Sequence, residues 1–540
     1  MSFSIPFDPL TYHYASRRNV VYAKNGMVCT GNPLAAQAGL DVLRRGGNAV
    51  DAAVAVASAL TVVEPTANGI GSDAFAILWK DGKLYGLNAS GPSPMSITAE
   101  AVQKKGFSSM PENGVIPVNV PGAPAAWGAL SERFGRLPLS DTLCSAIAYA
   151  EEGYPLSPGV ASLWGRAAAR YQAASCAHPE TKSWFETFLP NGRLPETGDL
   201  LRLPGHARTL SEIAAHGAAA FYEGETAERI DRFMKEYGGF LRKEDLAAYR
   251  PEWVEPLTTQ YHGYTVCEIP PNGHGITVLM ALNILSGMEP APDLYTETHR
   301  QIEAMKLAFT DAQAYVADPR YMSVSPNELL SEEYAASRRA LIGREALTPA
   351  PWQPVKGGTV YLCTADKDGN MVSYIQSNYM GFGSGVVVPG TGVALNNRGA
   401  NFYLDPAAAN CLGPGKKSYH TIIPGFLMKD GQPVGPFGIM GGFMQPQAHL
   451  QVLTSAIDHR LNPQDALDRP RWMWTGGKTI EAEQSFDPAI LGQLARAGHD
   501  IVVRQSSVPF GRGEIIWRDA ARGVLCGGCE MRTDGQVAAW

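Results

Sequence analysis

Gly357-Gly358-Thr359-Val360-Tyr361-Leu362 is the stretch of this 540-residue chain from which we predict the fold. A threonine follows two glycines and begins an apolar, β-favouring run. Asp366-Lys367-Asp368-Gly369-Asn370 then gives a strong turn signal, and a second apolar run occupies residues 371–377. The pattern predicts a β-hairpin whose first residue is Thr359.

Thr359 is also a candidate nucleophile. A threonine hydroxyl alone is weak, but a threonine at a chain N-terminus carries its own base, the α-amine, whose unperturbed pKa is about 7.7–8.0. To become a terminus, Thr359 must attack the carbonyl of Gly358, and water must then hydrolyse the ester. Glycine before the bond accepts the backbone conformations that this attack needs. Without its context, Gly-Gly-Thr is common in loops that enter strands, so the flanking motifs decide between the two interpretations.

These flanking motifs follow a recognisable order. They are Gly46-Gly47-Asn48-Ala49-Val50-Asp51-Ala52-Ala53, Val120-Pro121-Gly122, Pro270-Pro271, Glu303-Ala304-Met305-Lys306, Asp318-Pro319, Phe382-Gly383-Ser384-Gly385, Leu395-Asn396-Asn397, Gly413-Pro414 and Gly441-Gly442. Together with Gly357-Gly358-Thr359, they make the chain resemble the γ-glutamyltransferase (glutathione hydrolase) family of N-terminal nucleophile hydrolases. The resemblance covers residues 20–535.

The resemblance implies an α+β fold, a four-layer αββα sandwich formed jointly by two autocleaved subunits. Cleavage between Gly358 and Thr359 would give a large subunit, residues 1–358, and a small subunit, residues 359–540. Residues 343–358 would be a proline-rich linker at the end of the large subunit. The two subunits would stay together as a heterodimer, and a dimer of such heterodimers is a further option.

The resemblance also assigns catalytic roles. Thr359 would be the nucleophile, and Ser377 lies where the family places a hydroxyl that hydrogen-bonds the catalytic threonine. Gly441 and Gly442 match the oxyanion hole, in which one N–H donor contributes roughly 3–4 kcal/mol. His274, in a proline-rich loop, could act as a base, but a lone loop histidine is more often structural.

The predicted substrate pocket departs from the family pattern. Ser90 stands where the family has an arginine that holds the α-carboxylate of the glutamyl donor. Arg398 and Asn401 stand where the family usually has an uncharged and an acidic residue, the acid binding the donor's α-amine. A guanidinium suits a carboxylate, although Arg398 could instead form a structural salt bridge. His420 and Thr421 occupy the paired-serine position that contacts the donor carboxylate.

Composition limits the partners and the compartment. The formal net charge of -7, without a dense basic run, argues against a nucleic-acid partner. Residues 1–8 show no secretory signal, and the apolar run 52–63 is shorter than the about 20 residues of a membrane span. We therefore expect no membrane partner and a cytoplasmic location.

The eight cysteines are widely scattered, which indicates reduced thiols rather than a disulfide framework. Cys526 and Cys529 form a lone CxxC without the second pair of ligands that a zinc site requires, so a buried or incidental pair is the favoured interpretation. We expect no cofactor and no metal.

The sequence therefore predicts an amidohydrolase. The missing anchor arginine and the absent acid at position 401 favour a small carboxylate-bearing amide, such as the substrate of oxamate-type amidohydrolases in this family. γ-Glutamyl compounds such as glutathione, and larger side-chain amides as in cephalosporin acylase relatives, remain alternatives. An inactive relative acting as a binding protein is an alternative of another class.

Overall fold

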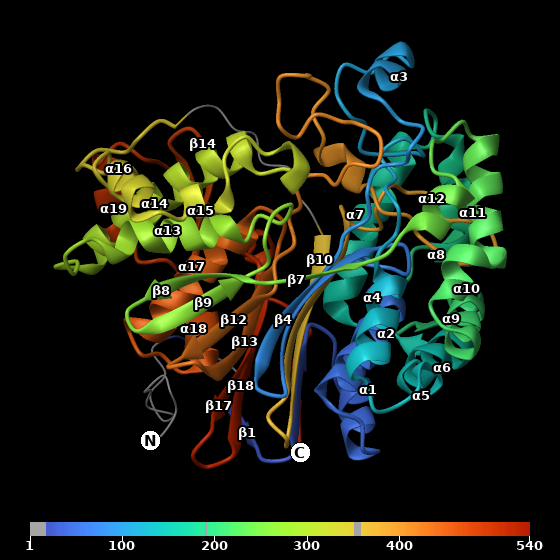
Figure 1. Cartoon of the computed structure of the whole chain (residues 1–540), viewed down its shortest axis with the longest axis horizontal. Helices are drawn as coiled ribbons and strands as arrows, with labels where there is room; N and C mark the ends of the chain where they lie inside the picture. Colours follow the sequence, from blue (N-terminus) through green and yellow to red (C-terminus); the bar gives the residue numbers. More distant parts are fainter. Residues whose placement is uncertain (1–13, 15–17, 190–191, 350–357) are drawn as a thin grey trace.

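Two seven-stranded sheets pack face to face and carry helices on both outer sides (Figure 1). The computed structural model describes residue 14 and residues 18–189, 192–349 and 358–540. This is the four-layer αββα sandwich that the resemblance implied, and the prediction is confirmed. Residues 350–357 of the predicted linker lie outside the described part.

The first sheet contains the predicted hairpin at its centre. Its strand order is β19-β2-β10-β11-β3-β4-β7. The bounds in this order are Gln536–Ala539, Gly26–Thr30, Gly358–Asp366, Met371–Tyr379, Asp73–Lys80, Lys83–Ala89 and Glu252–Val254. Strands β2 and β19 belong to opposite ends of the chain, so both predicted subunits build this sheet.

The second sheet has the order β1-β18-β17-β13-β12-β9-β8. Its strands are Val21–Ala23, Val524–Cys529, Arg512–Asp519, Gln432–Met440, Gly425–Lys429, Tyr264–Glu268 and Leu257–Tyr261. The sheets approach closely at Gly438, where a Cβ would lie 2.3 Å from Cε2 of Tyr361 in β10. Glycine is therefore required there by the close approach, and the Tyr361 ring fills the space between the sheets.

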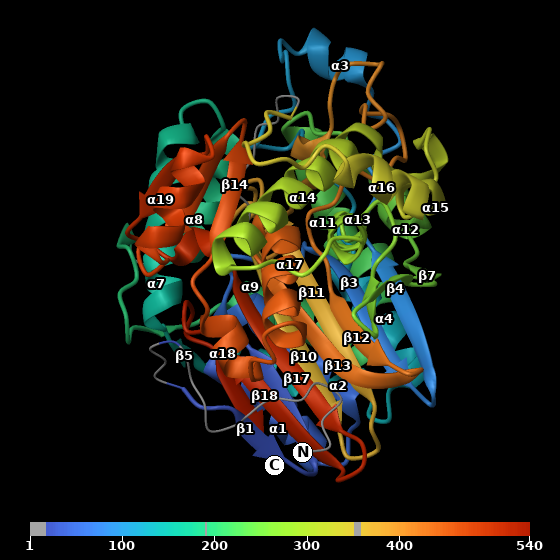
Figure 2. The same cartoon turned by 90° about the vertical axis from the view of Figure 1, so that its left-hand side faces the viewer.

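The outer helices are sorted by sheet. On the first sheet lie α1 (Pro33–Arg44), α2 (Ala49–Val63) and α4 (Ala123–Phe134). On the side of the second sheet lie α13 (Ile276–Ser286), α14 (Leu294–Tyr315), α17 (Met444–Ile457) and α18 (Pro463–Asp468). Helix α17 packs on β13 and lies in front of this sheet in Figure 2. Every residue of α2 is buried, consistent with a sequence that is apolar except for Asp51, Ser58 and Thr61. Asn48 and Asp51 begin α2 with a capping box.

The remaining elements lie outside the sandwich. The helices are α3 (Ala99–Lys104), α5 (Leu139–Thr142), α6 (Cys144–Glu152), α7 (Pro158–Ala174), α8 (Lys182–Phe188), α9 (Pro204–His216), α10 (Ala219–Glu223), α11 (Glu225–Glu236), α12 (Lys243–Ala248), α15 (Pro326–Leu329), α16 (Glu332–Arg339) and α19 (Pro488–Arg496). The short strands are β5 (Tyr154–Pro155), β6 (Leu200–Leu201), β14 (Trp472–Gly476), β15 (Thr479–Glu483) and β16 (Asp500–Arg504).

The CxxC cysteines lie in separate surroundings. Cys526 packs in the core between the second sheet and its helices, whereas Cys529 directs its Sγ to the carbonyl of Thr30, 3.7 Å away. Residues three apart on a strand point to opposite faces. Both thiols are free and buried. In the described ranges, no helix is long and apolar enough to cross a membrane.

Candidate active site

Thr359 lies at an irregularity of the central hairpin. Gly358 pairs with Tyr379 and Val360 pairs with Gln376, so two residues of β11, Ser377 and Asn378, oppose Thr359 alone. Such a bulge redirects side chains at strand ends. The Thr359 hydroxyl, whose residue is 1% exposed, donates to Oγ of Ser377 at 3.2 Å. The structure therefore brings together the two hydroxyls that the sequence predicted as neighbours.

Ser377 is held by the turn that follows it. The N–H of Tyr379 donates to Ser377 Oγ at 2.8 Å, and Tyr379 itself has a φ of +79°. A positive φ at a bulky residue is a strained conformation that surrounding contacts must maintain, and such strain is concentrated at functional sites. The hydrogen bond from Tyr379 positions the Ser377 hydroxyl beside Thr359.

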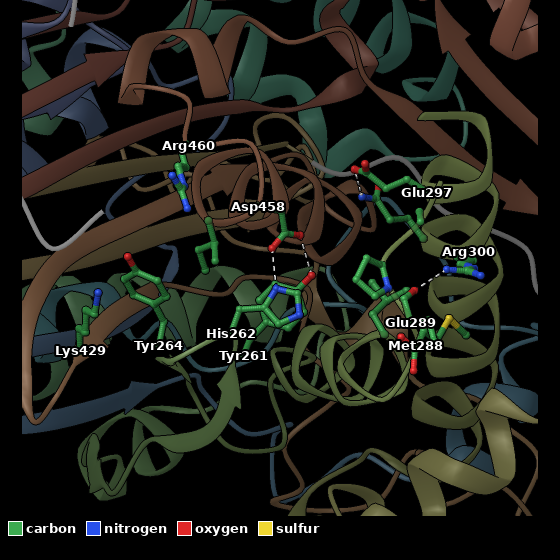
Figure 3. Close-up of a pocket in the computed structure, with 15 residues that line it drawn as sticks. Tyr261, His262, Tyr264, Met288, Glu289, Glu297, Arg300, Lys429, Asp458 and Arg460 are labelled. Atoms are coloured by element: carbon green, nitrogen blue, oxygen red, sulfur yellow. Dashed lines mark hydrogen bonds and ion pairs between the residues drawn. The ribbon is translucent and has the colours of Figure 1, made fainter. Parts of the chain in front are cut away.

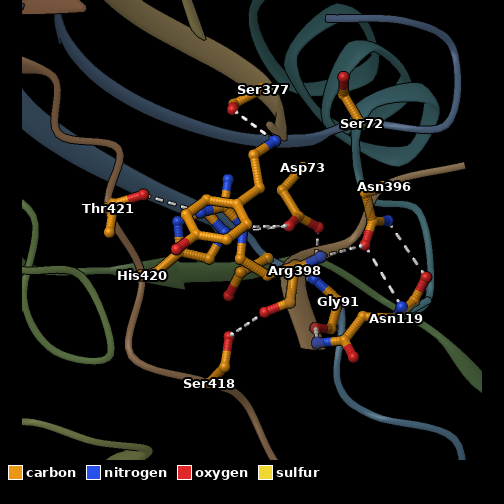
Figure 4. Close-up of polar contacts among 12 residues, drawn as sticks. Ser72, Asp73, Gly91, Asn119, Ser377, Asn396, Arg398, Ser418, His420 and Thr421 are labelled. Atoms are coloured by element: carbon orange, nitrogen blue, oxygen red, sulfur yellow. Dashed lines mark hydrogen bonds and ion pairs between the residues drawn. The ribbon is translucent and has the colours of Figure 1, made fainter. Parts of the chain in front are cut away.

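A buried ion pair lies one strand away from Ser377. Asp73 begins β3 directly opposite Ser377 in the sheet. Its Oδ2 accepts from Nε of Arg398 at 3.2 Å and faces Nε2 of His420 at 3.0 Å (Figure 4). Its Oδ1 accepts from the N–H of Gly91 at 3.0 Å. The Asp73 carboxylate thus contacts two of the predicted pocket residues, Arg398 and His420.

Arg398 is fully buried and lies in the 3-10 turn Arg398–Asn401. Nη1 donates to the hydroxyl of Thr421 at 2.9 Å, and the guanidinium lies 4.7 Å above the ring of Tyr379. Burial lowers the pKa of Arg398 and Asp73 raises it, but a guanidinium stays protonated in proteins. Tyr379 thus contacts the Arg398 guanidinium through its ring and Ser377 through its N–H, and Ser377 in turn contacts Thr359.

His420 is neutral in this environment. Burial and the neighbouring Arg398 lower the pKa of His420 to about 4. Because Nε2 faces the Asp73 carboxylate, the single ring proton sits on Nε2, and Nδ1 is an acceptor. The ring packs on Phe75 at 4.7 Å between centroids, which fixes its orientation.

Several buried polar atoms around this ion pair have no hydrogen-bond partner among the described residues. They are Nη2 of Arg398, Nδ2 of Asn401, Nδ1 of His420 and the hydroxyl of Tyr379. Buried polar groups in folded proteins are nearly always paired, so a cluster of unpaired ones indicates a place for a ligand or water. The first two can only donate, which favours an electron-rich group.

Gly441 and Gly442 form the turn from β13 to α17, with φ angles of +144° and +60°. Their carbonyls accept from the N–H groups of Met444 and Gln445, each at 3.1 Å. Within the described ranges, no backbone carbonyl accepts from the N–H of either glycine. Left-handed backbone at both positions requires glycine and leaves both N–H groups available.

The position of this turn follows from the residues before it. Gly438 lies on the Tyr361 ring, and the Cε of Met440 lies 3.2 Å from a Cβ placed on Gly31. Gly31 follows Thr30, the β2 residue that pairs with Leu362. The strand β13 therefore runs toward the end of the sandwich at which β10 begins. Gly441 and Gly442 lie at the same end as Thr359.

The other predicted site residues lie in the surrounding layer. Ser90 is fully buried and donates to Oδ1 of Asn88 at 2.7 Å, and it also contacts Asn272. The amide of Asn272 donates to the carbonyl of Ser418 at 2.8 Å. Ser90 is thus linked through Asn272 to the segment that carries Ser418, and its role in substrate binding stays a prediction.

His274 does not contact Thr359 among the described residues. Its Nδ1 faces the hydroxyl of Tyr419 at 3.3 Å, and its N–H donates to the carbonyl of His420 at 3.0 Å. Burial lowers the pKa of His274 well below its ordinary value. We therefore place it as a structural neighbour of the pocket.

Sequence reasoning missed Asp73. Asn401 stands where the family has an acid, and the structure places a carboxylate from another segment, Asp73, against Arg398 and His420. The signal in the sequence is the Gly69-Ile70-Gly71-Ser72-Asp73 loop. An acid that follows a glycine-rich loop and begins a buried strand is a usable clue.

Large cavities also lie elsewhere in the structure. One of about 640 Å³ opens between the β8–β9 hairpin and the ends of α13, α14 and α17 (Figure 3). Asp458 accepts there from the Tyr261 hydroxyl and faces Nδ1 of His262, each at 2.7 Å. Thr359 and Arg398 do not line this cavity, so it is separate from the candidate active site.

Comparisons with known proteins identify relatives that belong to one enzyme family. The sequence model described as Gamma-glutamyltranspeptidase matches residues 35–540. A glutathione hydrolase-like proenzyme (YwrD) of Bacillus subtilis is 36% identical over 94% of this chain and 97% of its own. The oxamate amidohydrolase proenzyme of Klebsiella pneumoniae is 34% identical over 96% of this chain and 98% of its own.

Among solved structures, cephalosporin acylase from Bacillus halodurans superposes with a TM-score of 0.94 at 59% identity, and the match covers 99% of both chains. The family consists of autoprocessed amidohydrolases of the N-terminal nucleophile class, and the curated relatives are named as proenzymes. This chain belongs to the gamma-glutamyltranspeptidase family of N-terminal nucleophile hydrolases.

Proposed function

We propose that this protein cleaves itself between Gly358 and Thr359 and then hydrolyses a small amide that carries a carboxylate, of the oxamate type. The carrying observation is the buried Arg398, whose Nη2 has no partner among the described residues, and the unpaired amide of Asn401 belongs to the same 3-10 turn. A carboxylate placed there would receive charge-assisted hydrogen bonds in a site shielded from water.

The polarity of the neighbouring groups supports this substrate class. Nδ1 of His420 is an acceptor, so it complements an N–H group next to the carboxylate. An oxamate-type amide carries both. An α-ammonium of a γ-glutamyl donor would instead need a free carboxylate. The nearest acid, Asp73, already accepts from Gly91 and Arg398 and faces His420, which leaves it little capacity for an ammonium.

The chemistry proceeds through an acyl-enzyme. The Thr359 hydroxyl attacks the amide carbonyl while its freed α-amine takes the proton, and Ser377 orients the hydroxyl. Gly441 and Gly442 donate N–H groups to the developing oxyanion. The C–N bond breaks and the amine leaves with the proton. Water then hydrolyses the Thr359 ester to give the free acid and restores the nucleophile.

A second candidate rests on the 59% identity to a cephalosporin acylase. The same nucleophile and oxyanion donors would serve a larger side-chain amide whose acyl group carries a carboxylate for Arg398. The two candidates share the pocket and differ in the size of the leaving amine.

A substrate panel separates these candidates. We expect purified processed protein to release ammonia from oxamate with a kcat/KM at least 10-fold above that for glutathione, because one added or lost charge-assisted hydrogen bond contributes about 1.5–3 kcal/mol. A cephalosporin side-chain amide belongs in the same panel. Faster turnover of glutathione than of oxamate would refute the proposed substrate class, and no turnover of any compound by processed protein would favour the binding-protein alternative.

A further inference from the structure

Four ionisable side chains form a buried cluster away from the candidate active site. His299, Glu303 and Lys306 occur at spacings of four and three on α14, so they share one helix face. His499, which follows α19, completes the cluster. Glu303, Lys306 and His499 have fully buried side chains, and His299 is 4% exposed. Glu303 and Lys306 form a buried ion pair, with Nζ of Lys306 2.8 Å from Oε1 of Glu303.

The hydrogen bonds of this cluster fix the position of each proton. Nε2 of His299 faces the carbonyl of Gly343 at 3.1 Å, so it carries the proton, and Nδ1 accepts. Nε2 of His499 lies 3.0 Å from that Nδ1 and must donate to it. Nδ1 of His499 is then an acceptor and lies 3.4 Å from Nζ of Lys306. Burial lowers the pKa of both histidines, for His499 to about 3, consistent with two neutral rings.

Lys306 completes the network with its other two protons. It donates to Oε1 of Glu303 at 2.8 Å and to the carbonyl of Leu347 at 3.2 Å. The N–H of Leu347 returns to Oε2 of Glu303 at 3.1 Å. Atoms of His299, Glu303 and His499 lie within 4.8 Å of one another, a spacing that could hold a metal ion. The Lys306 ammonium already provides a positive charge next to Glu303 and His499, where a metal ion would otherwise bind. All three of its protons face acceptors.

The groups bound by this cluster belong to the last described segment before the cleavage bond. We call residues 343–347 the arm. Besides the contacts of Gly343 and Leu347, the N–H of Ala346 donates to the carbonyl of Ala497 at 2.8 Å. His499 and Ala497 lie in residues 359–540, and the other members lie in residues 1–358. The cluster therefore joins the two predicted subunits.

We propose that His299, Glu303, Lys306 and His499 form a latch that anchors the arm of the large subunit to the small subunit once the chain is cut. The proposal rests on the cleavage at Gly358 proposed above. In the precursor, a covalent chain also holds the arm at its far end. After cleavage, the latch and the hydrogen bond from Ala346 to Ala497 hold the arm in place of that covalent chain.

Hydrogen exchange followed by mass spectrometry tests the latch on a peptide covering residues 340–349. In cleaved wild-type protein, we expect the amides of Ala346 and Leu347 to be protected, because both donate to buried acceptors. Lys306→Met should raise their exchange rates at least 10-fold. In a Thr359→Ala background, which keeps the chain whole, the same change should raise them less.

Two further variants keep the test decisive. Lys306→Met leaves Glu303 as a buried unpaired charge, which can prevent folding, so Glu303→Gln/Lys306→Met removes both charges and should show the same loss of protection. Arg300→Met on the same helix, whose guanidinium donates to the carbonyl of Glu289, should leave the arm protected.

The outcomes separate the latch from the proposed cleavage. Unchanged exchange in the double variant would overturn the latch, as would one equivalent of zinc in purified wild-type protein. Intact mass measures cleavage independently, so an uncut wild-type chain would refute the proposed processing. An uncut chain would also refute the role of the latch after cleavage. The exchange data would then report only the contacts of the arm in the precursor.

Discussion

A Thr359→Ala variant is expected to remain one 540-residue chain and to release no measurable ammonia from oxamate, whereas the wild-type protein should separate into two chains under denaturing conditions. The hydroxyl at position 359 is required twice, first to attack Gly358 and then to attack the substrate. Removal of the nucleophile from a hydrolase that forms an acyl-enzyme lowers kcat on the order of 10⁶-fold. Intact mass and N-terminal sequencing of the small chain check the first effect, and an ammonia assay checks the second.

Matched variants isolate the role of the hydroxyl. Thr359→Ser keeps both hydroxyl and amine, and should still be processed. Thr364→Ala removes a threonine hydroxyl from the same strand, where it donates to the carbonyl of Ala49 at 2.7 Å, and should be processed like wild type. Two chains from Thr359→Ala with a break after Gly358 would show that another group performs the cleavage.

Ser377→Ala should slow processing without abolishing it. The Ser377 hydroxyl accepts from Thr359 and is positioned by the N–H of Tyr379, so it orients the nucleophile but forms no covalent bond. A rate loss of about 2–10-fold corresponds to one oriented hydrogen bond between neutral groups, which contributes about 0.5–1.5 kcal/mol. The half-time of precursor disappearance measures it. An unchanged half-time would assign the orientation of Thr359 to other contacts.

Local signals were sufficient for the hairpin. The turn at residues 366–370 and the flanking apolar runs predicted strands that the structure places at Gly358–Asp366 and Met371–Tyr379. Helix starts follow equally local chemistry. Asn48, a favoured capping residue, caps α2, and α17 begins at Met444 directly after the glycine turn, with Pro446 in the first turn, where proline is tolerated.

The pocket was less predictable because its contacts join distant segments. Arg398 and Asp73 are 325 residues apart, and strand register, not sequence spacing, places Asp73 opposite Ser377. The latch similarly joins α14 to a residue after α19. Residue type indicated that Arg398 was unusual, but only the fold shows that it has a carboxylate partner and one unpaired nitrogen.

These two features of Arg398 determine the second large effect. Arg398→Met should lower kcat/KM for oxamate about 100-fold relative to oxamide, its uncharged analogue, because a charge-assisted hydrogen bond contributes about 1.5–3 kcal/mol. The change would also leave Asp73 buried without its cation, which costs about 3–5 kcal/mol of folding free energy. Loss of activity in this variant alone would therefore not distinguish substrate binding from stability.

The double variant Asp73→Asn/Arg398→Met resolves this ambiguity. It removes both charges, so its denaturation midpoint should recover toward that of the wild type, while the oxamate-to-oxamide ratio should stay low. Only protein shown by intact mass to be processed is assayed, because Asp73 lies opposite Ser377 and its loss can slow cleavage. Arg398→Lys keeps the charge but lacks the planar guanidinium group. Its oxamate-to-oxamide ratio should lie between those of the wild type and Arg398→Met. If the double variant is processed and still prefers oxamate as strongly as the wild type, Arg398 is a structural partner of Asp73, and the substrate carboxylate binds elsewhere.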